Sequence, residues 1–110
     1  MAEDKKNTLA KLPNFRLPCE STLLHASKLS ILEDKPIMLD YWTPSLNKDD
    51  DTKDKALIGV KSKIEKLLVK NEEEYTSPII KFFQNQNDFI IVTENSIYII
   101  DSGIQSRMIS

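Results

Sequence analysis

The strongest hydrophobic pattern in the chain is a pair of short apolar runs, 89–92 and 97–100, separated by four polar residues. β-Branched and aromatic residues fill both runs, and such residues favour an extended backbone. Asn95 tolerates the positive φ that a tight turn requires, although Glu94 does so poorly. The pattern therefore predicts a β-hairpin whose loop is either these two residues or a four-residue segment.

Both faces of the predicted hairpin are apolar. With a two-residue loop, Val92 lies opposite Ile97, and successive residues point to opposite faces of the sheet. Each face then carries four apolar residues: Phe89, Ile91, Tyr98 and Ile100 on one, and Ile90, Val92, Ile97 and Ile99 on the other. A sheet with one solvated face alternates apolar with polar residues, so we expect this hairpin to be covered on both faces.

Two further strands and one short helix are expected outside the hairpin. The segments 37–42 and 79–84 have the length and composition of strands, and 79–84 leads through a polar turn into the hairpin as an antiparallel meander. A short amphipathic helix is expected over 21–32. Pro36 prevents that helix from continuing into the first of the two strands.

The longest helical pattern spans residues 52–71. Five apolar residues recur there at helical spacing and define one face: Leu57, Val60, Ile64, Leu67 and Leu68. Ile58 and Val69 do not fit this face. They leave open a rival interpretation in which 56–60 and 66–70 are two strands.

These elements predict one α+β domain. Its small antiparallel sheet has strands near 37–42, 79–84, 89–93 and 96–101, packed by one long amphipathic helix (about 52–71) and a short N-terminal helix. The alternative is a mostly β small barrel or sandwich. We expect an extended arm over 1–18, a single domain over 19–110, and a short tail after Gly103 that adds an edge strand or swaps onto a partner.

Composition narrows the functional classes. The net charge of −2 gives the whole chain no general attraction for nucleic acid. No apolar run approaches the roughly 18–20 residues of a membrane span, and the N-terminal segment has no apolar signal region. One cysteine excludes an internal disulfide. We expect an intracellular, cytoplasmic protein (in the host if it is viral) that is not secreted and binds no membrane.

The sequence offers no convincing chemistry. Cys19 and His25 lie six residues apart, but a nucleophile pair also needs an orienting group and a shaped pocket. The acidic run 49–51 suggests a calcium loop, yet Lys53 and Asp54 stand where such a loop needs an oxygen ligand and a glycine. We therefore predict no catalytic residue, no cofactor and no metal site.

Apolar residues in the arm and on the strands are the candidates for partner binding. Trp and Tyr often anchor protein interfaces, and apolar residues in an extended arm can insert into a neighbour. Core packing and a floppy tail are the ordinary alternatives. The candidates are Leu12, Phe15 and Leu17 of the arm, Tyr41 and Trp42 of the first strand, and Ile97 and Ile99 of the hairpin.

A basic strip is expected on the long helix, opposite its apolar face. It consists of Lys55, Lys63, Lys66 and Lys70. Such a strip attracts phosphates or an acidic partner, but it also describes an ordinary solvated face.

The leading hypothesis is a non-enzymatic structural or protein-interaction module. It is expected to act either as an accessory subunit of a larger assembly, such as a viral one, or as a homo-oligomer. The alternative is a nucleic-acid-binding adaptor that uses the lysine strip.

Overall fold

The computed structural model describes residues 15–47 and 55–109. Two helices and seven strands follow one another in these residues. They are α2 (Glu20–Glu33), β1 (Ile37–Met38), α3 (Trp42–Leu46), β2 (Leu57–Val60), β3 (Lys66–Val69), β4 (Ile79–Asn85), β5 (Asp88–Thr93), β6 (Ile97–Asp101) and β7 (Gln105–Met108).

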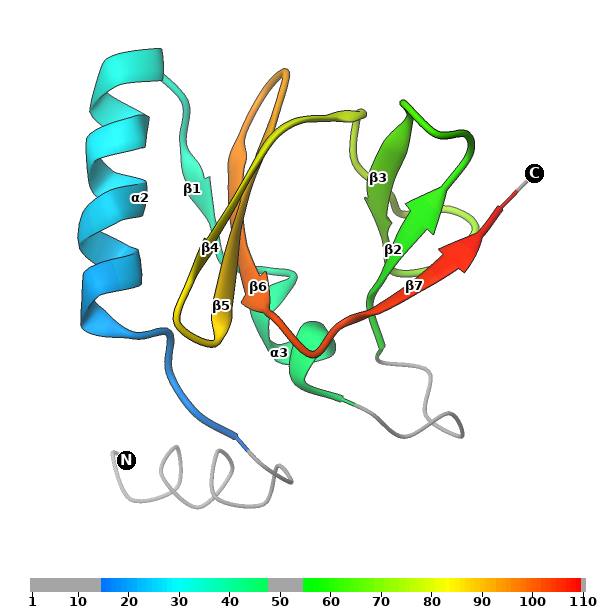
Figure 1. The fold of residues 1–110 in the computed structure, drawn as a ribbon, viewed down its shortest axis with the longest axis horizontal. Coiled ribbons are helices and arrows are strands. Elements are labelled where there is room, and N and C mark those ends of the chain that lie inside the picture. Colours follow the sequence, from blue (N-terminus) through cyan, green and yellow to red (C-terminus); the bar gives the residue numbers. More distant parts are fainter. Residues whose placement is uncertain (1–14, 48–54, 110) are drawn as a thin grey trace.

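The strands form two sheets that pack face to face. The larger sheet has the order β1-β6-β5-β4 and the smaller one β3-β2-β7. Most neighbouring strands are antiparallel, but β1 runs parallel to β6 and β7 runs parallel to β2. Both sheets are therefore mixed, whereas the sequence predicted a single antiparallel sheet. Figure 1 shows α2 on one side of the larger sheet and the smaller sheet on the other, which gives three layers.

The predicted hairpin is confirmed as β5 and β6. Val92 pairs with Ile97 and Phe89 pairs with Ile100, as a two-residue loop requires. One face packs against Ala26 of α2 and Trp42 of α3, and the other packs against the smaller sheet. The expectation that the hairpin is covered on both faces is therefore also confirmed.

The predicted long helix over 52–71 is wrong, and the rival interpretation as two strands is confirmed. The chain forms β2 and β3, joined by a turn in which the Lys61 amide donates to the Glu65 carbonyl at 2.9 Å. Ile58 and Leu68, one from each strand, are buried against the hairpin. A single helix would present one apolar stripe to that hairpin face, whereas two paired strands cover its breadth.

Gly59 stands at the centre of this smaller sheet. A Cβ atom at Gly59 would lie 2.7 Å from the Cδ1 atom of Ile109 and 3.0 Å from the Cγ2 atom of Val69. Glycine would weaken a helix at this position, but it suits this strand because the side chains of Ile109 and Val69 occupy the space that a Cβ atom would need.

The first predicted strand is much shorter than expected. Only Ile37 and Met38 pair with β6, and the chain then turns so that Trp42 begins the short helix α3. The Trp42 amide donates to the Leu39 carbonyl at 3.1 Å, which closes that turn. The tryptophan reaches the core only because the strand stops early.

The two ends of the described domain follow their predictions more closely. The short helix expected over 21–32 is α2, and it ends at Asp34, whose φ of 53° is left-handed. The tail forms β7 as an edge strand of the smaller sheet.

Candidate protein-binding surface

The part of the arm that is described docks onto its own chain through Arg16. The guanidinium lies 2.7 Å from Asp88 Oδ1 and 2.6 Å from Asp101 Oδ1, and it stacks over the Trp42 ring with its carbon 4.8 Å from the ring centroid. The indole Nε1 of Trp42 in turn donates to the Arg16 carbonyl at 2.8 Å. These contacts connect the arm to both strands of the hairpin.

Asp88 is the fully buried acid of this network. Its Oδ2 accepts hydrogen bonds from the Cys19 amide and the Thr22 hydroxyl, both at 2.7 Å. Burial by itself raises the pKa of the Asp88 carboxyl, but these bonds and the Arg16 guanidinium outweigh burial and hold the pKa below its usual value. This network was not predicted from the sequence, where its signal was an acid at each end of the hairpin together with one arginine in the arm.

The predicted partner-binding residues of the arm are not brought together on one surface. Leu12 lies outside the described residues. Phe15 packs against the core beneath α2, whereas Leu17 is exposed.

The other predicted partner-binding residues lie in the core. Trp42, Ile97 and Ile99 are buried beneath α2, and Tyr41 is buried between the two sheets. Core packing, the ordinary alternative, describes their positions, because α2 and the smaller sheet of the same chain cover them; partner binding by these residues stays a prediction. Burial raises the pKa of the Tyr41 hydroxyl, and the Lys70 ammonium lies 4.5 Å from the centroid of its ring.

The predicted lysine strip disappears together with the long helix. Lys70 follows the end of β3 and forms ion pairs with Glu74 at 3.0 Å and with Asp40 at 3.5 Å. Lys55 precedes β2. Only Lys63 and Lys66 stay together, in the β2–β3 turn and at the start of β3.

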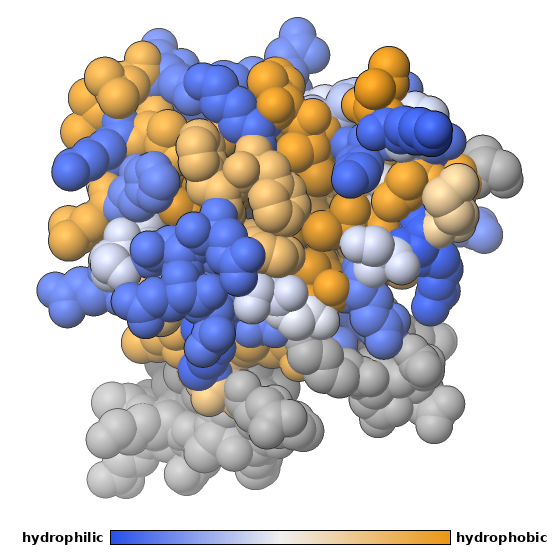
Figure 2. All heavy atoms as spheres, in the orientation of Figure 1, coloured by the Kyte–Doolittle hydropathy of each residue, from blue (hydrophilic) through white to orange (hydrophobic). Residues whose placement is uncertain are grey.

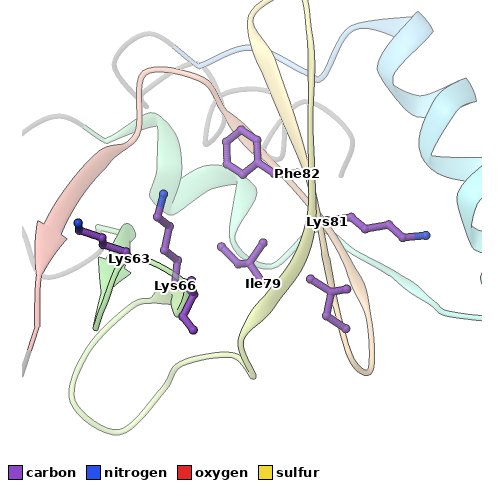
Figure 3. A pocket seen from close by; sticks show the side chains of 7 residues that line it. Lys63, Lys66, Ile79, Lys81 and Phe82 are labelled. Atoms are coloured by element: carbon purple, nitrogen blue, oxygen red, sulfur yellow. The ribbon is translucent and has the colours of Figure 1, made fainter.

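A groove brings these two lysines close to the edge strand β4 (Figure 3). Its volume is about 320 Å³. The residues that line it, which we call the β3–β4 groove, are Lys63, Ile64, Lys66, Ile79, Ile80, Lys81 and Phe82.

Apolar and basic side chains meet in the β3–β4 groove. Figure 3 shows Ile79 and Phe82 leaving β4 on the side of β3, while Lys81 leaves on the opposite side. Lys81 forms an ion pair with Glu33 of α2 at 2.9 Å, so its charge is already matched. Phe82 remains 47% exposed. The groove therefore presents an accessible aromatic ring beside two lysines.

The outer face of α2 is a second exposed apolar surface, formed by Leu24, Ile31 and Leu32. These side chains are 61%, 81% and 80% exposed, respectively. Leu24 and Ile31 are seven residues apart and so lie on one side of the helix. Figure 2 shows hydrophobic residues at this side of the molecule and over β4 in the middle of the same view.

The sequence contained the signal for this second surface. The segment 21–32 has apolar residues on both sides, so its stripe is weak, and the inner side is taken by Ala26 and Leu29. A helix that carries apolar residues on two sides and is covered on only one of them leaves apolar residues in solvent.

Comparison of the chain with protein-family models, with curated proteins and with solved structures finds no match. Within residues 15–47 and 55–109, no three histidine, cysteine or acidic side chains are grouped as metal ligands. In the same ranges, no helix combines the length and the apolarity needed to cross a bilayer.

Proposed function

We propose that this chain is a non-enzymatic protein-interaction module, working as a homo-oligomer or as an accessory subunit of a larger assembly. The observation that carries the proposal is the outer face of α2. Three large aliphatic side chains there are at least 61% exposed on a helix whose inner face already covers the hairpin.

The size of these side chains supports contact with another protein. Full burial of a Leu or Ile side chain stabilises a protein or a complex by about 1.5–3 kcal/mol of free energy. A side chain left in water does not make this contribution. Single exposed apolar residues are ordinary on protein surfaces, but a group of them on one element is typical of an interaction site. The fold itself does not require them, because Ala26 and Leu29 supply the inward contacts of α2.

Light scattering over a range of concentrations tests the proposal. We expect the wild-type chain to associate, and we expect a triple variant, Leu24→Gln, Ile31→Gln and Leu32→Gln, to remain monomeric with its fold intact. Glu72→Gln together with Glu73→Gln is the control, because both residues are exposed and lie outside α2. A wild-type chain that stays monomeric to about millimolar concentration, and is no less soluble than the triple variant, would contradict the proposal.

Nucleic-acid binding is the weaker candidate. Lys63 and Lys66 lie beside the ring of Phe82, and a basic site next to an aromatic ring is one way to hold a single strand. Lys70, however, is matched by Glu74 and Asp40. This reduces the four-lysine strip on which that candidate depended to two residues.

A further inference from the structure

We infer that the free edge of β4 accepts an extended acidic segment of a partner protein as a fifth strand of the larger sheet. This inference deepens the proposed interaction function and rests on it. It concerns a surface separate from the outer face of α2.

Among the described strands, the position of β4 in the larger sheet leaves one of its two edges unpaired. It is the last strand in the order β1-β6-β5-β4, and with seven residues it is the longest strand of the described chain. Unpaired amides and carbonyls along such an edge are a template for another strand. A bulge between Ile79 and Lys81 occupies the beginning of β4, and pairing is regular over 82–85.

The alternation of the hydrogen-bond ladder shows which backbone groups point outward. The Thr93 amide donates to the Ser96 carbonyl at 2.9 Å, so these two residues form a bonded pair at the loop between β5 and β6. Bonded and non-bonded pairs alternate along antiparallel strands. Thr93 therefore points its backbone groups toward β6, while its neighbour Val92, and Ile90 two residues earlier, point theirs toward β4.

The same alternation continues across β4. The partners of Val92 and Ile90 are Lys81 and Phe83, whose backbone groups therefore point inward toward β5. The residue between them, Phe82, directs its amide and carbonyl toward the free edge, as Gln84 does. A guest strand would find its first hydrogen bonds at these two positions.

The side chains near this edge specify the chemistry of the guest. Phe82 and Ile79 offer apolar contact on the side of β3, and Ile64 stands 94% exposed across the groove. Lys63 and Lys66 add two positive charges, and no ion pair within residues 15–47 and 55–109 matches either one. A strand that places apolar side chains in the groove and carboxylates opposite these lysines satisfies both features.

A second copy of β4 does not provide this complement. The strand reads IIKFFQN and contains no acidic residue. Two copies paired edge to edge would bring like charges together, because each copy lies near its own Lys63 and Lys66. The charge of the groove thus favours a different, acidic strand as the occupant.

Titration of the ¹⁵N-labelled full chain with synthetic peptides tests the inference by NMR. The probe is a blocked eight-residue peptide whose odd positions alternate valine with glutamate and whose even positions are threonine, so that one face of the strand carries both apolar and acidic side chains. Its counterpart has lysine in place of glutamate. We expect the glutamate peptide to shift the amide signals of Phe82 and Gln84 most strongly. The paired substitution Lys63→Glu and Lys66→Glu should weaken its binding at least roughly tenfold, because two attractive charge pairs become repulsive.

Two controls separate strand addition from general attraction. N-methylation of the peptide amides on its bonding edge should abolish binding, while N-methylation on the opposite edge should leave it. The inference would be overturned if the two N-methylated peptides bound equally well. It would also be overturned if the glutamate peptide bound equally well to the protein with Lys63→Glu and Lys66→Glu, or if an eight-nucleotide oligothymidine bound more tightly than the peptide.

The two proposals fail in distinguishable ways. Association through α2 together with no binding of the glutamate peptide would overturn the strand-addition inference and leave the interaction function in place. A chain that neither associates nor binds the peptide would contradict both.

Discussion

The β5–β6 hairpin and its neighbour β4 have similar compositions but opposite environments. Six aliphatic residues of the hairpin are 0% exposed: Ile90, Ile91, Val92, Ile97, Ile99 and Ile100. In β4, Ile80 is 57% exposed and Phe82 is 47% exposed, although β4 is bonded to the same sheet.

Position within the layers explains this difference. α2 covers one face of the hairpin and the smaller sheet covers the other, and β4 lies beyond the hairpin at the edge of the sheet. An apolar strand is therefore a core element at the centre of the sheet and an exposed surface at its edge. Ile80 and Phe82 of β4 are therefore left in solvent, whereas Ile79 and Phe83 of the same strand still pack against the core.

The largest expected effect is at the centre of the hairpin. Ile99→Ala should lower the free energy of unfolding by about 3–4 kcal/mol, because it leaves a cavity in fully buried packing. Ile80→Ala is the matched change on β4 and should cost less than about 1 kcal/mol. Urea unfolding measures both variants, and similar losses would show that β4 is as well packed as the hairpin.

The next effect concerns the buried acid where the hairpin begins. Asp88→Asn should destabilise the chain by about 2–3 kcal/mol near neutral pH, because it uncouples Arg16 and weakens the bonds from Cys19 and Thr22. Glu94→Gln, an exposed acid in the loop of the same hairpin, is the matched control. Equal stability of both variants would contradict a structural role for the network.

Acidification should bring the stability of the wild-type chain closer to that of Asp88→Asn. The pKa of Asp88 in the folded chain lies below its ordinary value of 3.8. Its stabilising contribution is therefore complete above about pH 4 and is lost as the pH falls through the folded pKa. Wild-type stability should fall more steeply below pH 4 than that of Asp88→Asn, as thermal unfolding at successive pH values would show. Parallel curves would mean that Asp88 is not the titrating group.

The smallest effect compares two adjacent phenylalanines of β4. Phe83 packs beneath α2 with its ring 5.3 Å from that of His25, whereas Phe82 lies half in solvent against Phe89. Phe83→Ala should cost about 2–3 kcal/mol and Phe82→Ala about 1 kcal/mol, in proportion to the contact each ring makes. A larger loss for Phe82 would make that ring part of the core and remove it from the proposed binding edge.

Local sequence features predicted the hairpin and α2. β-Branched residues on both sides of Glu94 and Asn95 determine strand, turn and register together, and the apolar character of both faces predicted two covering layers. None of this depends on distant residues, because propensity, alternation and turn chemistry act within about fourteen positions.

The candidate site was much less predictable. Lys63 and Lys66 were singled out on a helix that does not form, and Lys81, Ile79 and Phe82 of the same groove were not identified as a site at all. The groove is assembled from two segments that meet only when the smaller sheet packs against the larger one. No spacing within either segment carries that information.

The amino-acid sequence by itself therefore determined a hairpin that must be covered on both faces and a short helix that precedes it. Tertiary structure decided what covers the hairpin, because 56–60 and 66–70 are too short to choose between helix and strand by their own periodicity. Their pairing and their burial against Ile91 and Ile100 made that choice. Tertiary structure also placed Trp42 in the core, separated the four lysines of the predicted strip and left β4 at the exposed edge of the larger sheet.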